Sequence, residues 1–390
     1  MKQTFLAKGV LGNLEFMKVL VLIHEYPPIG GGGGAVAESI ANELIALGED
    51  ICVLSSNVAE GSLPNHAHQK GVNLIRVPTR RKELHRATFF EMVSYLISGF
   101  FAAKKLLKNW KPDIIHVHFA VPAGVLAWVI SKLYNIPYAI TIHLGDVPGG
   151  APEKTKKWFQ WIFPFTKSIW GNASRIVAVS NFTKELALES YPFPIDVIPN
   201  GIKLGNMKSK NIVVGEVPKI IFAGRFVEQK NPIQLVRVLG KVSDLSWECL
   251  MLGNGPLFEN TMNEIEDQGL QKRISLPGWV NPERVQNELE KSDILFMPSL
   301  TEGMPIIGIE ALAEGLAIVA SHSFSDLVVE NENGYTYPSD DYDGMEAGLR
   351  YLLNDGEKLL KARNKSLEMS ADFDIKIIAQ RYKDLFYTYI

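Results

Sequence analysis

The 390-residue sequence is poor in cysteine and in unbalanced charge. Its two cysteines, Cys52 and Cys249, lie in opposite halves without metal-like spacing. This pattern excludes a disulfide framework and is typical of buried free thiols in a reducing compartment. The formal net charge of −3 argues against nucleic acid as a partner, because a nucleic-acid footprint needs excess positive charge. A local basic patch on anionic lipid stays compatible with this balance.

Long hydrophobic runs are also missing. The longest nearly uncharged apolar runs, 92–103 and 119–130, have 12 residues each, whereas a helix needs roughly 18 to 20 to cross a bilayer. Lys8 and Glu15 interrupt any signal-like region near the start. We therefore predict a cytoplasmic protein without a transmembrane helix, and we interpret residues 1–16 as a dispensable extension before a first strand that starts near Met17.

Apolar runs alternate with helix-like segments along the first half of the chain. A strand at 19–23 is followed by His24-Glu25-Tyr26-Pro27-Pro28, five glycines at 30–34 and a helix-like stretch at 35–47. Such alternation predicts a doubly wound parallel sheet. The further strands expected here are 51–54, 74–77, 114–117, 138–142 and 176–179, with a long helical segment at 89–110.

A second cycle of the same kind follows a polar, glycine-containing stretch. Residues 199–201 and 215–218 are typical of a hinge. We therefore expect one Rossmann-like domain at 17–199 and another at 200–374, with a terminal helix at 375–390. The second cycle has expected strands at 220–223, 248–252, 274–276, 294–297 and 317–320, and expected helices near 232–241, 256–268, 282–290 and 306–314.

The segment from Thr301 to Glu314 carries the strongest functional signal. It places Glu302 and Glu310 eight positions apart, on either side of Pro305. Proline is favoured at a helix start, so a helix is expected to begin near Ile306. The unpaired N–H groups of its first turn, at Ile306 and Ile307, and the partial positive charge there favour a phosphate, while a carboxylate can accept two ribose hydroxyls.

This segment resembles the E-x7-E motif of the retaining glycosyltransferases of family 4, and the likeness extends over nearly the whole chain from Met17 onward. The resemblance implies the GT-B fold, in which two Rossmann-like domains face each other across a cleft and the terminal helix crosses back onto the first domain. It also implies a nucleotide-diphosphate sugar as donor. By resemblance, Glu302 lies near the donor sugar and Glu310 binds the ribose.

Three further residues match the family's catalytic positions. Arg225 and Lys230, five apart after the first strand of the second half, resemble a diphosphate clamp. Two cations suit a leaving group that gains negative charge as the glycosidic bond breaks. His143 resembles the family's histidine near the donor sugar, although a histidine at a strand end is often structural. The neighbouring Asp146, like Asn200 in a Pro-Asn-Gly turn, is expected at the acceptor side or cleft edge.

The five glycines have two interpretations. They fit a dinucleotide fingerprint loosely, without the acidic residue expected after the following strand. By resemblance, Gly32 and Gly33 instead lie over the donor phosphates and sugar; a merely flexible turn is the third possibility. In the second half, Gly278-Trp279-Val280 is expected to place Val280 near the nucleotide base.

No metal and no cofactor besides the donor substrate are predicted. His116 and His118 face one side of a strand, but no acidic or cysteine residue lies at a sequence spacing typical of a metal site. Asp341 and Asp343 spell a D-x-D sequence in what we expect to be a polar loop. The chain also departs from many relatives at 321–326, where Ser-His-Ser-Phe-Ser-Asp replaces a glycine pair followed by glutamate, so detailed sugar or acceptor contacts do not carry over there.

The stretch from Lys154 to Trp170 combines four lysines with three tryptophans and three phenylalanines. It suits peripheral contact with an anionic membrane, on the inner face of the cytoplasmic membrane, or a helix pair that Pro164 breaks. The function expected from all these features is transfer of a sugar, with retention, to a glycan or lipid-linked acceptor. The alternatives are a nucleotide-sugar epimerase of the same fold and a catalytically silent sugar-nucleotide-binding protein.

Overall fold

The structure is a computed structural model that describes residues 16–58, 63–69, 71–84, 87–150, 159–205 and 212–388. Most of the proposed extension at 1–16 lies outside the described residues. The chain divides into two compact units. One comprises residues 1–140, 171–175 and 382–390, and the other comprises 141–170 and 176–381. We call them unit 1 and unit 2 and describe each by itself.

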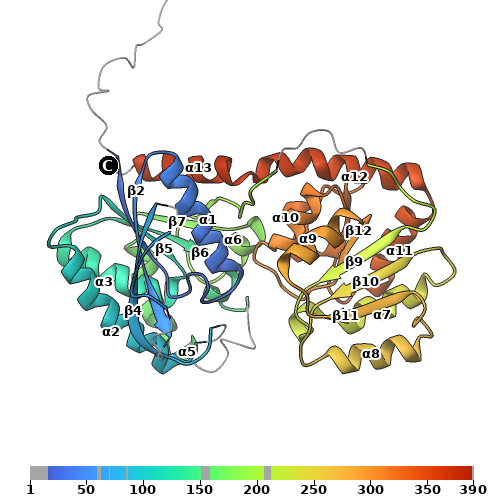
Figure 1. Cartoon of the computed structure of the whole chain (residues 1–390), viewed down its shortest axis with the longest axis horizontal. Coiled ribbons are helices and arrows are strands. Elements are labelled where there is room, and N and C mark those ends of the chain that lie inside the picture. Colours follow the sequence, from blue (N-terminus) through green and yellow to red (C-terminus); the bar gives the residue numbers. More distant parts are fainter. Residues whose placement is uncertain are drawn as a thin grey trace, which may run out of the picture. The chain divides into compact units, whose positions relative to one another are not determined.

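The first sheet has eight strands in the order β3-β4-β2-β1-β5-β6-β7-β8. Figure 1 labels β2, β4, β5, β6 and β7 of this sheet. The pairs β1–β2, β1–β5 and β2–β4 are parallel, whereas β3 is an antiparallel edge strand. From β1 the order runs outward in both directions, so the sheet reverses between β1 and β5. The strands are β1 (Lys18–Leu22), β2 (Asp50–Val58), β3 (His66–Gln69), β4 (Val72–Arg81), β5 (Ile114–His118), β6 (Tyr138–Ile142), β7 (Arg175–Ala178) and β8 (Asp196–Val197).

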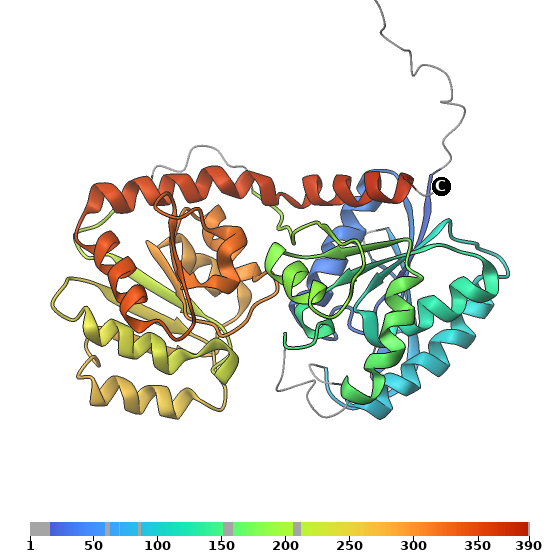
Figure 2. The same ribbon diagram turned by 180° about the vertical axis from the view of Figure 1, so that it is seen from behind.

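Helices connect most of these parallel strands, as in a doubly wound fold, whereas β3 lies between β2 and β4 in the sequence. Figure 1 and, from behind, Figure 2 show α2 and α3 side by side on the sheet. Thr88 and Glu91 form a capping box that starts α2. The helices are α1 (Gly32–Ala46), α2 (Phe89–Leu106), α3 (Val125–Tyr134), α5 (Phe159–Gly171) and α6 (Asn181–Leu188).

The second sheet has six strands in the order β11-β10-β9-β12-β13-β14, and all its pairs are parallel. Counted within this sheet, the order is 3-2-1-4-5-6, the arrangement of a Rossmann fold, which reverses between β9 and β12. The strands are β9 (Lys219–Ala223), β10 (Glu248–Leu252), β11 (Ile274–Gly278), β12 (Ile294–Met297), β13 (Ala317–Ser321) and β14 (Gly334–Tyr337).

Six helices accompany this sheet in the described part of the chain, and the last one is followed by α13 (Ile375–Tyr387). Burial on both faces of the sheet explains why its strands read as continuous apolar runs: Ile220, Ile221 and Phe222 of β9 are all fully buried. The six helices are α7 (Pro232–Lys241), α8 (Phe258–Asp267), α9 (Pro282–Glu290), α10 (Ile306–Ala313), α11 (Tyr342–Leu353) and α12 (Gly356–Ser370).

The last turns of α13 belong to unit 1. There the rings of Tyr382 and Phe386 lie 5.0 and 5.1 Å from the His116 ring, measured between centroids. The Lys383 ammonium lies 2.7 Å from the buried Glu49 carboxylate. The amphipathic spacing of the terminal helix therefore serves to bury an aromatic stripe and to pair one internal carboxylate.

The expected strands are confirmed within one or two residues at most ends, and both cysteines are confirmed as buried free thiols. Burial raises the pKa of Cys52 to about 12, so this thiol stays protonated. Two expectations are wrong. Helix α1 begins at Gly32 rather than at residue 35, because glycines can occupy a first helical turn. Helix α5 continues through Pro164, which therefore does not break it.

Candidate functional site

The candidate site lies in unit 2, where the second sheet reverses. In open α/β sheets, ligands bind at the carboxyl ends of the strands at such a switch point. Here the loops that leave β9 and β12 are Gly224–Asn231 and Pro298–Pro305. They contain Arg225, Lys230 and Glu302, so the topology brings together residues that lie more than 70 positions apart in the sequence.

Lys230 and Glu302 form an ion pair. The Lys230 Nζ lies 2.5 Å from Glu302 Oε1, and the two side chains are 16% and 10% exposed. The Lys230 stem packs over Gly224, where a Cβ would make ordinary van der Waals contact with the Lys230 Cδ and Cε atoms at 3.6 Å. The structure therefore holds a cation and a carboxylate at the predicted positions, largely shielded from water.

Gln229 joins the two loops and was not predicted from the sequence. Its Nε2 donates to the Thr301 carbonyl oxygen at 2.9 Å, and its own carbonyl oxygen accepts from the Leu300 N–H at 2.8 Å. These two bonds fix the spacing of Lys230 and Glu302. A polar residue inside the Arg225–Lys230 stretch was the available signal, but its partners are fixed by tertiary structure.

Arg225 is exposed, unlike Lys230. Within the described part of the chain, no carboxylate lies within ion-pair distance of its guanidinium. A guanidinium without an internal partner at a strand end suits an external anion, because it offers a planar set of donors.

Helix α10 begins at Ile306, as predicted. Pro305 is the N-cap, no side chain caps the helix, and no acidic residue lies in its first turn. In an α-helix each N–H donates to the carbonyl oxygen four residues earlier. The N–H groups of Ile306 and Ile307, in the first turn, therefore have no acceptor within the helix. The partial positive charge of this helix start therefore lies three residues from Glu302 and next to the switch point.

Glu310 lies on α10 one turn after its start. Burial, and secondarily the nearby Glu314 carboxylate, raise the pKa of Glu310 to about 7. A carboxyl group with this pKa changes its charge in the neutral pH range. Carboxyl groups with perturbed pKa values occur at functional sites and at structural ion pairs. Among the residues that the structure describes, no ion pair holds Glu310, so it is a candidate for a binding role.

His143 and Asp146 form a compact turn at the end of β6. The His143 N–H donates to the Asp146 carboxylate at 2.9 Å, and the His143 side chain accepts from the Asp146 N–H, which completes a capping box. Burial lowers the pKa of His143 to about 4, so the ring is neutral at physiological pH. The Asp146 carboxylate therefore holds the turn, and the His143 ring carries no positive charge.

Asn200 contacts the chain just before α10. Its Nδ2 donates to the Met304 carbonyl oxygen at 2.9 Å, and its side chain is buried. The same loop approaches Thr183, whose Oγ1 donates to the Gly303 carbonyl oxygen at 3.4 Å. Asn200 thus braces the loop of Glu302, a contact that the sequence did not reveal.

The loops after β10 and β11 complete the carboxyl edge of this sheet. Gly253 has φ +134°, and a Cβ there would collide with the Gly224 carbonyl oxygen, so only glycine permits this close approach of two loops. Trp279 is 73% exposed, and Val280 packs partly against the core. An exposed indole beside a strand end offers a flat apolar surface of the kind that a base can stack on.

Gly32 and Gly33 occupy the first turn of α1, in unit 1. They follow β1 and lie where the first sheet reverses, next to β5. A Cβ at Gly33 would lie 2.6 Å from the Phe119 ring, which follows β5. The Phe119 ring therefore covers Gly33, whereas Gly32 is exposed with no atom within 4 Å of a Cβ, so the backbone at Gly32 is open to close approach.

No group of three or more metal-binding side chains occurs among the residues that the structure describes. His116 and His118 lie with ring centroids 4.3 Å apart inside unit 1. The expectation of a loop at Asp341–Asp343 is wrong: Asp341 caps α11 through the Gly344 N–H, and Asp343 lies within the helix, paired with Lys241.

Within the described ranges, no helix has the length and apolarity needed to cross a membrane. The predicted membrane-contact segment lies partly outside the described residues, at 154–158. In its later part Phe165 is 73% exposed, whereas Ile169 and Trp170 are buried.

Comparison with known proteins adds to this geometry. Residues 206–369 match the family model described as glycosyl transferases group 1, and residues 30–205 match the model described as glycosyltransferase family 4. Together the two matches cover residues 30–369, which include the whole second sheet and every strand of the first sheet except β1.

Two relatives and one solved structure illustrate the likeness. The chain is 28% identical to a Bacillus subtilis protein named for teichuronic acid biosynthesis, TuaC, over 78% of this chain and 81% of that protein. It is also 28% identical to the UDP-Gal:α-D-GlcNAc-diphosphoundecaprenol α-1,3-galactosyltransferase of Escherichia coli, over 72% and 77%. The sucrose-phosphate synthase of Thermosynechococcus elongatus superposes with a TM-score of 0.81 at 18% identity, over 95% of this chain and 98% of that one.

Proposed function

We propose that this chain, which is a glycosyltransferase of the GT-B type, transfers a sugar with retention from a nucleoside-diphosphate sugar to a hydroxyl group of a glycan or lipid-linked acceptor. The observation that carries the proposal is the cluster at the switch point of the second sheet. There Arg225, Lys230 and the start of α10 offer three sources of positive charge beside Glu302. A diphosphate is the ligand that such a set fits.

Each part of the cluster has a proposed role. Arg225 and Lys230 bind the diphosphate, together with the N–H groups of Ile306 and Ile307, while Glu310 accepts the ribose hydroxyls. Glu302 contacts the sugar, and Val280 lies near the base. We carry over from the sequence the prediction that Gly32 and Gly33 also contact the donor. With these cations present, the proposed reaction requires no divalent metal.

The proposed chemistry is front-face displacement. With its pKa lowered to about 4, the His143 ring is a weak base for the acceptor hydroxyl, and the Asp146 carboxylate is engaged by the His143 N–H. The acceptor hydroxyl would therefore transfer its proton to the departing phosphate, while Arg225 and Lys230 offset the negative charge that develops there. His143 would stabilise the sugar through its position rather than through its charge.

The names of the relatives favour a particular substrate class. The Escherichia coli enzyme is named for UDP-galactose and a sugar linked to diphosphoundecaprenol. A UDP-sugar and a lipid-linked or cell-surface acceptor are accordingly the first candidates here. The two alternatives are a nucleotide-sugar epimerase and a catalytically silent sugar-nucleotide-binding protein. Arg225, which has no carboxylate partner among the described residues, lies in the same cluster as the Lys230–Glu302 pair and favours a catalytic protein over a silent binding protein.

A panel of UDP-, GDP- and ADP-sugars tests the proposal. A ligand at 100 times its dissociation constant stabilises the native state by about 2.7 kcal/mol, so the matching donor should raise the melting temperature clearly. Incubation with that donor and a lipid-linked acceptor should yield a product whose anomeric configuration, read by NMR coupling constants, equals that of the donor. Inversion, transfer abolished by EDTA, or release of nucleoside diphosphate without transfer would each contradict part of the proposal.

We also propose peripheral contact with an anionic membrane on the cytoplasmic side. The support comes from α2, where Phe90, Ile97 and Phe101 recur at spacings of seven and four residues and are 78%, 57% and 64% exposed. Such spacing places them on one face of the helix. Lys104 and Lys105 follow in its last turn, where they suit lipid headgroups.

Vesicle sedimentation measures this contact. The wild-type protein should sediment with vesicles that contain anionic phospholipid and much less with neutral ones. The double variant F90S/F101S should lose most of this binding, because each buried phenylalanine contributes about 1.5–3 kcal/mol. Met262→Ser changes another exposed apolar residue, in α8, and serves as the control. Equal loss in both variants would refute a specific role for α2.

A further inference from the structure

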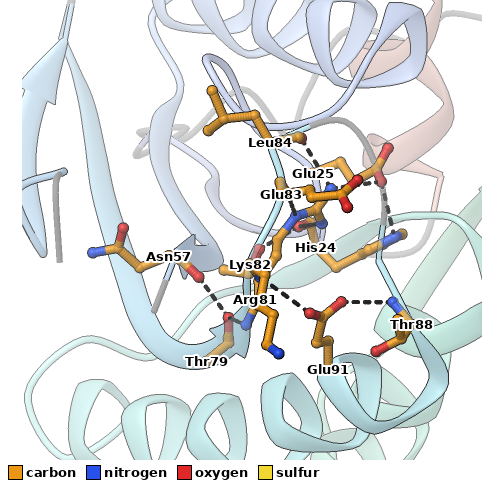
Figure 3. A network of polar contacts seen from close by, with 11 residues as sticks. His24, Glu25, Asn57, Thr79, Arg81, Lys82, Glu83, Leu84, Thr88 and Glu91 are labelled. Carbon is orange, nitrogen blue, oxygen red and sulfur yellow. Dashed lines mark hydrogen bonds and ion pairs between the residues drawn. The ribbon is translucent and has the colours of Figure 1, made fainter. Parts of the chain in front are cut away.

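Arg81, at the end of β4, is almost completely buried in unit 1 and has four oxygen partners (Figure 3). Its Nε donates to the Glu83 carbonyl oxygen at 2.8 Å, and its Nη2 donates to the Leu84 carbonyl oxygen at 3.0 Å. Its Nη1 lies 3.4 Å from the His24 carbonyl oxygen, and Nη2 lies 3.1 Å from Glu25 Oε1. One guanidinium thus links the end of β4 to the loop that follows β1.

The loop after β1 leads directly into the glycine turn, which we define as Gly30–Gly34. The Gly30 N–H donates to the Leu84 carbonyl oxygen at 2.7 Å, the same oxygen that accepts from Arg81. Gly30 has φ +99°, and a Cβ there would lie 2.5 Å from the Glu25 Cβ. A Cβ at Gly34 would lie 2.5 Å from the Glu25 carbonyl oxygen. Both ends of the glycine turn therefore pack against Glu25, the residue whose carboxylate Arg81 binds.

Two further bonds hold the start of this loop. The Ser56 Oγ of β2 donates to the His24 carbonyl oxygen at 2.6 Å, and the Arg76 Nη2 of β4 donates to the Pro27 carbonyl oxygen at 2.7 Å. These bonds fix residues 24–27. Arg81 is the group that also reaches Leu84, the partner of Gly30, so its loss is expected to affect the turn itself rather than the loop before it.

Charge makes the arginine hard to replace. Burial lowers the pKa of His24 to about 4, so the imidazole that lies 3.6 Å from the Glu25 carboxylate is uncharged at neutral pH. Arg81 then supplies the positive charge for Glu25. A lysine has a single ammonium group and cannot reach four oxygens that a planar guanidinium contacts from three nitrogens.

We propose that Arg81 is a positioning residue that holds the glycine turn in the conformation that receives the donor. This inference rests on the proposed function, in which Gly32 and Gly33 contact the donor. Arg81 does not touch substrate in this account. It acts through Glu25 and through the Leu84 carbonyl oxygen, and it keeps the open backbone of the turn from sampling other conformations.

The test compares Arg81→Lys with a control in the same network. Arg81→Lys should raise the KM for the donor about tenfold or more, the effect of losing one or two charge-assisted hydrogen bonds, and leave kcat nearly unchanged. It should also speed hydrogen exchange of the Gly30 amide at least tenfold. Glu25→Gln removes the charge and keeps the shape, so it should raise the donor KM by a smaller factor of about three.

Glu91→Gln is the matched control. The Glu91 carboxylate accepts from the Lys82 N–H at 3.0 Å and from the Thr88 N–H at 2.6 Å (Figure 3). It therefore holds the same segment as Arg81 without reaching the glycine turn. This variant should lower the melting temperature but leave the donor KM and the exchange of the Gly30 amide unchanged.

Gly32→Ala separates failure of this inference from failure of the proposed function. No atom lies within 4 Å of a Cβ at Gly32, so the protein tolerates the methyl group, whereas a donor on the turn would meet it. If Gly32→Ala raises the donor KM and Arg81→Lys does not, Arg81 has no positioning role and the proposed donor contact stands. If neither variant changes it, both ideas are wrong. An equal rise of KM in Glu91→Gln would also overturn the role of Arg81.

Discussion

Replacement of Lys230 by methionine is expected to lower kcat by about 10²- to 10³-fold, the loss seen when one donor to a developing negative charge is removed. The Lys230 ammonium is largely shielded from water and lies 2.5 Å from Glu302 at the switch point of the second sheet. Methionine retains much of the stem that packs over Gly224 and removes the charge. Steady-state kinetics with the donor identified by the panel measure the effect.

Stability must be separated from catalysis in this variant. Lys230→Met leaves the buried Glu302 carboxylate without its cation, which costs about 1–3 kcal/mol of folding free energy. The double variant K230M/E302Q should recover the melting temperature but not the activity. Lys241→Met removes an exposed lysine of α7 from its pair with Asp343 and should leave kcat unchanged. Wild-type kcat in a folded Lys230→Met protein would remove Lys230 from the mechanism.

Replacement of Glu310 by glutamine is expected to raise the donor KM about 10- to 100-fold at pH 8, because a carboxylate binds two hydroxyl groups more strongly than an amide does. The pH dependence has a definite sign. Since the pKa of Glu310 is raised to about 7, the carboxylate is ionised at pH 8 and becomes protonated as the pH falls to 6. The wild-type KM should therefore rise toward acid, whereas the Glu310→Gln value should stay flat.

Two features make this experiment specific. A nucleotide sugar is the appropriate ligand, because a free nucleoside diphosphate carries a terminal phosphate that itself titrates near neutral pH. The His143 ring, with a pKa of about 4, stays neutral over the whole range. Glu314→Gln removes the second cause of the raised pKa of Glu310, so it should move the inflection to lower pH. An unchanged inflection in Glu310→Gln would assign it to another group.

The sequence was sufficient to predict the elements that form the site. Strands buried on both faces read as apolar runs, and Pro305 marks the start of α10 because its fixed φ suits a helix start. The pairing of Lys230 with Glu302 was not predicted, since the order of strands that brings β9 next to β12 is not written in either segment. Alternation of strands and helices predicted a doubly wound sheet, but only the observed strand order shows where its loops meet.

Other features could not be predicted because they depend on distant partners. Gln229 was not predicted, and Asn200 was expected only at the cleft edge, because the carbonyl oxygens of Thr301 and Met304 that they bind are brought beside them by the fold. Pro164 was expected to break a helix, but the structure continues α5 through it. Arg81 gave no signal at all, because a buried arginine differs from an exposed one only in its surroundings.

The two hydrogen bonds of Gln229 imply that the loops after β9 and β12 behave as a single mechanical element. The Gln229 side chain donates to Thr301 and its carbonyl oxygen accepts from Leu300, both in the loop after β12, so a displacement of either loop is expected to carry the other with it. Any rearrangement during turnover would then preserve the distance between ammonium and carboxylate and change only their common distance to the sugar. Changes in donor preference would accordingly arise at residues around Lys230 and Glu302, while the spacing of these two residues stays fixed.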